Sequence, residues 1–227
     1  MASLFIDCIV KIIFNKFIKN ILARPSIILA VFWSSYFNLL LMRKLNGVQL
    51  STMQLKVICA TIKRKIPCKL LVFGLGNDSF FWTNLNRKGV TVFLEDNKEW
   101  FKNVMKKSEN IKAYLVSYNT QRKDWEIMLE DKSLLEMTLP NDVEKEAWDV
   151  ILVDAPAGWN DESPGRMKSI FLSSKLIRIS GDIFVHDCDR EVEEIYCDKF
   201  LQKENLRMEI KAPIGFLRHY HIMNRFV

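Results

Sequence analysis

From residue 69 to the end of the chain, short apolar runs alternate with charged, amphipathic segments. Runs that are apolar throughout suit strands buried on both faces of a parallel sheet, and segments such as NKEWFKNVMKK suit the helices that cover it. Five such runs cover residues 69–74, 90–95, 111–117, 148–154 and 181–187. The last part, LRMEIKAP followed by FLRHYHIM, predicts two antiparallel strands. We therefore expect an α/β fold with a mostly parallel, doubly wound (Rossmann-like) sheet and a C-terminal antiparallel hairpin.

Charge divides the chain into two parts. The 227 residues carry a formal net charge of +6, but residues 1–67 hold ten Lys and Arg against one acid, Asp7. The remaining residues hold 23 Lys and Arg against 26 Asp and Glu, a slight acidic excess. This argues against a nucleic-acid partner, because phosphate binding needs a basic face. The composition, 49% hydrophobic and 26% charged, excludes a disordered chain and a multi-span membrane protein.

The N-terminal part contains a long uncharged stretch. Residues 25–42 carry no charged side chain, and as a helix they would span about 27 Å, slightly less than the hydrocarbon core of a bilayer. Basic residues before the stretch favour a single membrane anchor with a cytoplasmic N-terminus. The alternative is a soluble helical segment that packs on the domain or across a homodimer interface. In both cases we expect an N-terminal helical segment at 1–47 and an α/β domain at 48–227.

The turn after the first strand predicts a nucleoside site. In FGLGNDSFFW, Gly74 and Gly76 would let the backbone turn tightly and approach a ligand before a helix begins near Asp78 and Ser79. Dinucleotide sites use GxGxxG, whose third glycine is replaced here by Ser79, so a nucleoside without a pyrophosphate fits better. S-adenosylmethionine is the leading candidate. The alternative for both glycines is an ordinary tight turn.

An acid at the end of the second strand supports the same site. Glu95 follows the glycine turn by about twenty residues, where a carboxylate can accept hydrogen bonds from the two hydroxyls of a ribose. The alternative is a solvated strand end. The candidate cofactor contacts are therefore Gly74, Gly76, Asp78, Ser79, Glu95 and Asp96.

The fourth and fifth strands end in groups suited to acid–base or metal chemistry. Asp154 ends the fourth strand, and His186 and Asp187 end the fifth. Because adjacent parallel strands end at the same crevice, we expect these three candidate catalytic residues to converge. They could move a proton, or Asp154 and Asp187 could hold a divalent cation with Asp189 as a third ligand. Alternatively, Asp187 caps the next helix and Asp154 anchors a loop.

The long loop at 155–166 predicts a lid or an acceptor site. Its prolines and glycines make it stiff and rich in turns. Arg166 at its end could bind a carboxylate through two parallel hydrogen bonds, or it could be a structural arginine bonded to nearby carbonyls. The candidate substrate contacts are Trp159, Arg166 and, on the last strand, His219.

Four motifs in order resemble one family. FGLGNDS, VFLEDN, WDVILVDAPAGWNDESPGRM and VHDCDREVE look like the plant glucuronoxylan 4-O-methyltransferase family, also called the IRX15-like domain, over residues 48–227. The resemblance implies a Rossmann-like, S-adenosylmethionine-dependent methyltransferase and a type II protein of the Golgi membrane. Its reaction moves a methyl group to O4 of glucuronic acid on xylan.

Carried over to this sequence, the resemblance implies cofactor contacts at Gly74, Gly76, Asp78 and Glu95. It implies an acceptor region at Asp154, Arg166, His186 and Asp187. We expect Asp154 to be the base or cation ligand. Two functional alternatives stay open: a diverged O-methyltransferase of a small-molecule hydroxyl, and a non-catalytic scaffold in xylan deposition. The alternative to the Golgi membrane is a cytoplasmic location.

Overall fold

The computed structural model describes residue 39, residue 43 and residues 47–106 and 110–224. The proposed membrane stretch at 25–42 lies outside these residues apart from Leu39. Among the helices that are described, none has the length and apolar character needed to cross a bilayer.

One mixed sheet forms the centre of the described chain, with the strand order β3-β2-β1-β4-β5-β7-β6. The first five strands in sequence pair in parallel, and β7 pairs antiparallel with both β5 and β6. The strands are β1 (Lys69–Phe73), β2 (Val90–Glu95), β3 (Lys112–Leu115), β4 (Trp148–Val153), β5 (Ile177–His186), β6 (Leu206–Ile210) and β7 (Leu217–His221). The predicted fold is confirmed, including the C-terminal hairpin.

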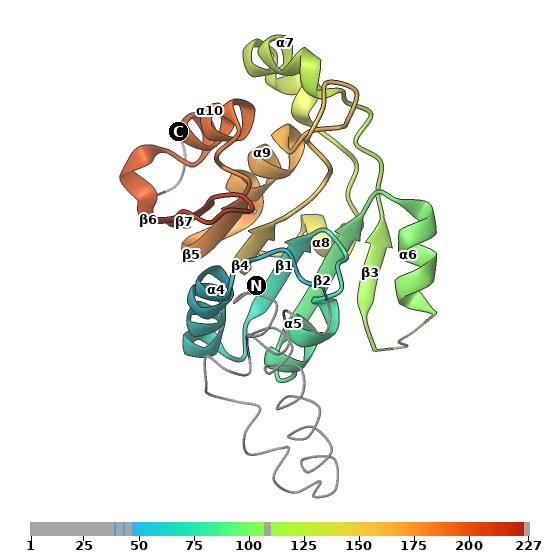
Figure 1. Ribbon diagram of the computed structural model, residues 1–227, viewed down its shortest axis with the longest axis vertical. Coiled ribbons are helices and arrows are strands. Elements are labelled where there is room, and N and C mark those ends of the chain that lie inside the picture. The colour runs from blue at the N-terminus through green and yellow to red at the C-terminus, as the bar shows by residue number, and fades with distance from the viewer. Residues whose placement is uncertain (1–38, 40–42, 44–46, 107–109, 225–227) are drawn as a thin grey trace, which may run out of the picture.

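Helices cover both faces of this sheet (Figure 1). One face packs on α4, α5 and α6, and the other packs on the α7–α10 segment. The α-helices are α4 (Thr52–Lys65), α5 (Ser79–Leu85), α6 (Lys98–Met105), α7 (Trp125–Glu130), α8 (Asn141–Glu144), α9 (Met167–Leu176) and α10 (Glu191–Phe200). Short 3-10 turns lie at η1 (Arg122–Asp124), η2 (Lys132–Leu135) and η3 (Lys203–Asn205).

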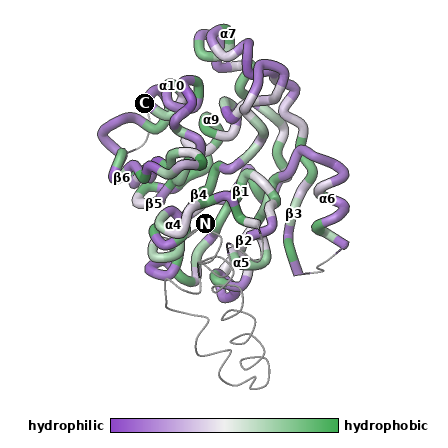
Figure 2. The backbone as a smooth tube through the Cα atoms, in the orientation of Figure 1, coloured by the Kyte–Doolittle hydropathy of each residue, from purple (hydrophilic) through white to green (hydrophobic). Residues whose placement is uncertain are grey.

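Alternate strand residues face opposite helix layers, because side chains along a strand point to opposite sides of the sheet. In β1, Leu70 and Val72 pack with the α4 side, and Leu71 and Phe73 pack with the α9 side. Both sets are buried, which explains why the strands are apolar throughout. Figure 2 shows the hydrophobic segments concentrated along the central strands.

Helix α4 has a clear sequence-encoded start. Ser51 accepts a hydrogen bond from the Gln54 backbone N–H at 3.3 Å, and the Gln54 side chain accepts one from the Ser51 N–H at 2.7 Å. This capping box satisfies two backbone donors that the first turn would otherwise leave free. Pro67, which cannot continue a helix, lies two residues beyond its end. The helix is thereby fixed just before β1, against the sheet.

The strands β1, β3, β4 and β5 differ from the prediction at one or both ends. β5 begins at Ile177, earlier than the expected residue 181, because residues 177–180 extend the strand without an apolar run, and most of them are exposed. β3 ends at Leu115 rather than at residue 117. β1, β4 and β5 each end one residue earlier than predicted, so the candidate catalytic residues still lie at the carboxyl ends of β4 and β5.

Candidate active site

The turn after β1 brings the backbone of two strand ends into close contact. Gly74 has φ +119°, a conformation that favours glycine, and its N–H donates to the Leu94 carbonyl at 2.7 Å. A Cβ atom at this position would lie 3.1 Å from the Ala155 Cβ, just after β4. The predicted glycine turn therefore lies directly beside the loop that follows Asp154.

Beyond the turn lie a constrained acid and an unpaired hydroxyl. A Cβ at Gly76 would lie 2.5 Å from Asp78 Oδ1, and the Trp82 indole N–H donates to Asp78 Oδ2 at 2.8 Å. Burial, together with the charge of Asp154, raises the pKa of Asp78 to about 6. The Ser79 hydroxyl is buried and has no hydrogen-bond partner. A free buried hydroxyl beside a glycine turn fits a polar ligand, because buried polar groups are normally paired.

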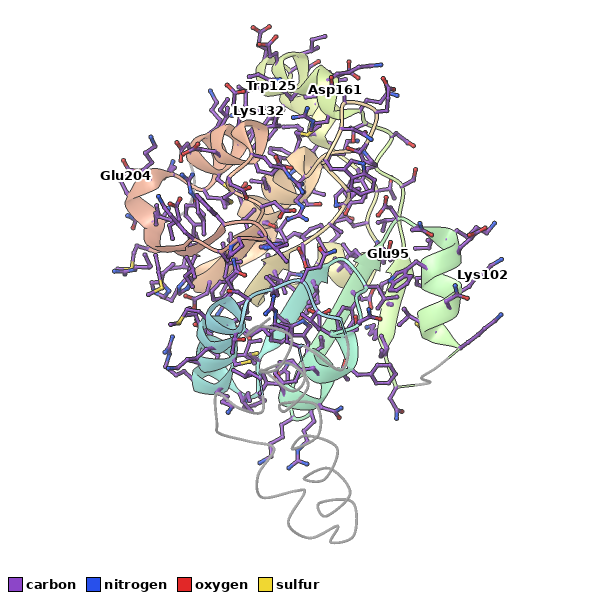
Figure 3. The ribbon with its side chains drawn as sticks, in the orientation of Figure 1. Glu95, Lys102, Trp125, Lys132, Asp161 and Glu204 are labelled. Carbon is purple, nitrogen blue, oxygen red and sulfur yellow. The ribbon has the colours of Figure 1, made fainter. Side chains whose placement is uncertain are left out.

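Glu95 lies at the end of β2, near the centre of the molecule (Figure 3). One carboxylate oxygen accepts from the Leu75 N–H at 2.9 Å, and the other accepts from the Asn97 N–H at 2.8 Å. Burial raises the pKa of Glu95 and of its half-buried neighbour Asp96. Because each carboxylate oxygen can accept a second hydrogen bond, Glu95 is oriented by the glycine turn and still able to accept from a ligand hydroxyl.

Asp154 and His186 form an ion pair at the ends of β4 and β5. His186 Nδ1 lies 2.9 Å from Asp154 Oδ1, and its Nε2 lies 3.1 Å from the Ile214 carbonyl oxygen. Both neighbours are acceptors, so the ring is satisfied when both nitrogens carry protons. Burial disfavours this charge, but the hydrogen bond and charge of Asp154 outweigh it and raise the pKa of His186.

The pair leaves Asp154 as the accessible member. Burial raises the pKa of Asp154, but the His186 hydrogen bond and the Arg166 charge outweigh it, so the pKa is lowered and the carboxylate is ionised at neutral pH. Its side chain is 28% exposed, whereas the His186 side chain is buried. The predicted direct action of His186 on the acceptor does not fit this geometry, because the ring is buried and both of its nitrogens contact acceptors of the chain.

Arg166 is a structural arginine that joins the ends of β4 and β5. Its Nε donates to the Pro156 carbonyl at 3.3 Å, Nη1 to the His186 carbonyl at 2.6 Å and Nη2 to the Asp154 carbonyl at 2.7 Å. Nη2 also lies 2.8 Å from Asp187 Oδ2, and the side chain is buried. The predicted binding of an acceptor carboxylate is wrong for this residue, because the chain itself uses its donors and covers it.

The three aspartates do not form the predicted cation site. The Arg166 guanidinium lies between Asp154 and Asp187, at 3.4 Å and 2.8 Å, and itself supplies the positive charge between them. Asp189 instead accepts the Phe216 N–H at 2.8 Å. Within residues 47–106 and 110–224, no three His, Cys, Asp or Glu side chains are placed to hold a metal ion. The donor set therefore does not fit a divalent cation.

The loop at 155–166 is held against the segment before α7. The Arg122 side chain pairs with Asp161 at 2.5 Å, and the Lys123 side chain pairs with Glu162 at 3.0 Å. Figure 3 shows Asp161 near Trp125, the first residue of α7. Trp159, a predicted substrate contact, is 72% exposed on this loop. The loop is thus a fixed rim with an exposed aromatic side chain.

His219 does not lie at the site. Its Nε2 contacts Asp182 Oδ1 at 2.7 Å, and its ring stacks on Phe184 with centroids 4.3 Å apart. Asp182 lies in the middle of β5, away from the carboxyl end that carries His186. The predicted substrate contact at His219 is therefore wrong, because the β7 register turns it toward Asp182 rather than toward the ends of β4 and β5.

Sequence reasoning missed the loop between β6 and β7. Gly215 has φ +74°, and a Cβ there would lie 2.7 Å from His186 Nε2, so the loop packs directly on the Asp154–His186 pair. The buried side chain of Gln54 in α4 donates to the Gly215 carbonyl at 2.9 Å and fixes the loop. No periodic sequence pattern predicts this contact. The only sequence signal is the glycine itself, a residue type suited to a positive φ, and this signal is weak.

Comparisons with known proteins agree on the family. The model of the IRX15/IRX15L/GXM family matches residues 53–138 and 127–220. Glucuronoxylan 4-O-methyltransferase 2 of Arabidopsis thaliana is 38% identical over 182 residues, which cover 71% of this chain and 61% of the relative. Arabinogalactan O-methyltransferase 2 of the same plant is 34% identical over 201 residues, which cover 78% of this chain and 68% of the relative.

A solved structure supports the fold. A candidate caffeoyl-CoA O-methyltransferase from Staphylococcus aureus superposes with a TM-score of 0.53 at 13% identity, over 83% of this chain and 92% of the other. At this identity the similarity concerns the fold alone. The sequence matches are stronger, although the chain spans only about three fifths of the length of the first relative. On the family model and these identities, the chain belongs to the IRX15/IRX15L/GXM family.

Proposed function

We propose that the protein is an S-adenosylmethionine-dependent O-methyltransferase whose acceptor is a hydroxyl of glucuronic acid, O4 on glucuronoxylan. The relatives named for methylation of glucuronoxylan and arabinogalactan support a polysaccharide acceptor. The observation that carries the proposal is Asp154, an ionised and partly exposed carboxylate that lies beside the glycine turn. The Golgi membrane, the anchor at 25–42 and a homodimer stay predictions.

The turn and Glu95 have the groups needed to hold the cofactor. Glu95 would accept hydrogen bonds from the ribose hydroxyls, and the free Ser79 hydroxyl would pair with a polar group of the ligand. Asp78 lies beside the turn with a pKa of about 6, so its carboxylate is largely ionised at neutral pH and would attract a cationic ligand. When bound, S-adenosylmethionine supplies a methyl group on a positively charged sulfur.

Asp154 would accept the proton of the acceptor hydroxyl. A carboxylate with a lowered pKa is a weak base, but the hydroxyl proton becomes strongly acidic as its oxygen forms a bond to the methyl carbon. A weak, well-positioned base therefore suffices. His186 and Arg166 both contact the carboxylate and hold it in place, so buried, hydrogen-bonded groups would fix the orientation of the acceptor oxygen.

The test is Asp154→Asn, assayed with methyl-labelled S-adenosylmethionine and glucuronoxylan. Loss of a general base is expected to lower kcat by about 100-fold or more, while calorimetry shows cofactor binding retained. Asp149→Asn is the matched control, because Asp149 lies at the other end of β4 and accepts the Lys69 N–H. Full activity of Asp154→Asn with bound cofactor would refute the role of Asp154.

A panel of acceptors separates the competing functions. Labelling of glucuronoxylan supports the proposal, whereas labelling only of small phenolic or alkaloid hydroxyls supports a diverged methyltransferase. A protein that gains no thermal stability from S-adenosylmethionine would instead be a scaffold, because a ligand that binds only the folded state stabilises it.

A further inference from the structure

Two of the described cysteines face each other beside the candidate active site. Cys188 Sγ lies 3.8 Å from Cys197 Sγ, and both side chains are buried. Cys188 follows Asp187 directly after β5, and Cys197 lies in the second half of α10. Both are free thiols in this structure. Because the two sulfurs are in contact, no other group of the chain separates them.

The backbone holds both cysteines at fixed positions. The Cys188 N–H donates to the Phe216 carbonyl at 3.0 Å, which ties Cys188 to the loop between β6 and β7. The Leu201 N–H donates to the Cys197 carbonyl at 2.8 Å at the end of α10. Both side chains belong to the hydrophobic core on the α9 side of the sheet. The contact between the sulfurs therefore joins two ordered segments of the fold.

The pair meets a geometric condition for a disulfide. Cysteines can be joined only when their Cα–Cβ bonds do not point apart, and the contact between the two Sγ atoms shows that these side chains point toward each other. A bond requires the sulfurs to approach to about 2 Å. We expect rotation about the Cα–Cβ bonds of both cysteines to supply this movement.

The other two described cysteines are placed differently. Cys59 and Cys68 belong to the hydrophobic core on the α4 side of the sheet, so the sheet separates them from Cys188 and Cys197. The Cys68 Sγ donates to Asn86 Oδ1 at 3.4 Å, so this thiol faces an amide and not a sulfur. Cys59 and Cys68 therefore serve as internal controls for any reaction of the facing pair.

We propose that Cys188 and Cys197 form a reversible intramolecular disulfide that joins the end of β5 to α10 under oxidising conditions. The co-reactant is a low-molecular-weight disulfide such as glutathione disulfide. One cysteine loses its proton and attacks a sulfur of this disulfide, which breaks the glutathione S–S bond and releases one glutathione thiolate. The other cysteine loses its proton and attacks the resulting mixed disulfide, which forms the Cys188–Cys197 bond and releases the second thiolate. The two thiolates take up the two protons, so the cysteines are oxidised by two electrons and glutathione disulfide is reduced.

The bond would fasten α10 to the segment that carries Asp187. Asp187 Oδ2 lies 2.8 Å from both Arg166 Nη2 and Arg190 Nη2, and Arg190 lies inside the loop that the bond closes. Because a disulfide restricts the unfolded chain, the oxidised protein should unfold at a higher temperature than the reduced protein. Burial raises the pKa of the Cys188 thiol, so exchange in the folded chain should take minutes to hours.

The test is a disulfide map of the full chain. The protein is incubated folded, or refolded from urea, in glutathione buffers that range from reducing to oxidising, and free thiols are alkylated during denaturation. Because Arg190 lies between the two cysteines, trypsin places them on separate peptides that only a disulfide keeps together. We expect a linked Cys188–Cys197 peptide in oxidising buffer and its loss in reducing buffer. Cys59 and Cys68 should be alkylated in both.

Serine variants and thermal unfolding complete the test. Cys188→Ser and Cys197→Ser should lose the linked peptide and unfold at the same temperature in both buffers, whereas Cys59→Ser, the matched control, should keep the wild-type behaviour. Absence of the linked peptide after both folded incubation and refolding would overturn the proposal. A linked protein that unfolds at a lower temperature than the reduced protein would also overturn it, because the native fold would then not accommodate the bond. Neither result depends on methyl transfer, so the proposed function is tested separately.

Discussion

Replacing Arg166 tests whether this buried arginine holds the active site together. Arg166→Ala removes the donors from the carbonyls of Pro156, His186 and Asp154, and it leaves Asp187 with one fewer cation. Removing one partner of a buried ion pair costs about 3–5 kcal/mol. Since domains are stable by only about 5–15 kcal/mol, this loss is a large part of the total.

The free energy of unfolding measures this cost directly. We expect urea denaturation, followed by tryptophan fluorescence, to show Arg166→Ala less stable than wild type by about 3–5 kcal/mol. Arg166→Lys should recover only a small part, because an ammonium cannot reach carbonyls on several sides at once. Arg178→Ala is the control: its ion pair with Asp149 is half-exposed on the arginine side and is expected to contribute about 1 kcal/mol or less.

One combination of results would refute a structural Arg166. If Arg166→Ala unfolds within about 1 kcal/mol of the wild type and raises the KM for the acidic acceptor, then Arg166 binds substrate. In that case the hydrogen bonds to the strand-end carbonyls do not determine the position of the Arg166 side chain.

Two further predictions concern pH and the glycine turn. The pKa of His186 is raised above its ordinary value of 6.5, and that of Asp154 is lowered below its ordinary value of 3.8. The ion pair therefore contributes its full stabilisation between pH 3.8 and pH 6.5. Its contribution falls as pH rises through the raised His186 pKa or drops through the lowered Asp154 pKa. The difference in unfolding free energy between wild type and His186→Gln should therefore shrink above pH 6.5, and a constant difference from pH 5 to 9 would contradict the charged pair. Gly74→Ala places a Cβ at φ +119° and 3.1 Å from the Ala155 Cβ, so we expect a loss of about 1–3 kcal/mol and weaker cofactor binding by calorimetry; wild-type values for both would show that the turn tolerates a side chain.

The strands and their ends could be predicted because they follow from local patterns. Apolar runs give the buried parallel strands, and parallel pairing places the ends of neighbouring strands at one edge. This is why Asp154, His186 and Asp187 meet as expected, and why Gly74 and Glu95 lie on one side of them.

The direction of individual side chains could not be predicted, because it depends on contacts between distant segments. Arg166 turns inward to strand-end carbonyls that only the folded sheet brings together. His219 turns toward Asp182 because of how β7 pairs with β5. Gly215 covers His186 through a loop whose position is fixed from α4, more than 150 residues earlier. In each case the role of the residue depends on its tertiary partner and not on its residue type alone.

The most direct test of the account is the position of the transferred methyl group. Incubation of the full chain with methyl-labelled S-adenosylmethionine and unmethylated glucuronoxylan, followed by NMR of the released oligosaccharides, should show the label on O4 of glucuronic acid. The Asp154→Asn variant should bind the cofactor and leave the acceptor unlabelled. Bound cofactor with no label on any glucuronic acid, or label of equal intensity from Asp154→Asn, would contradict the account.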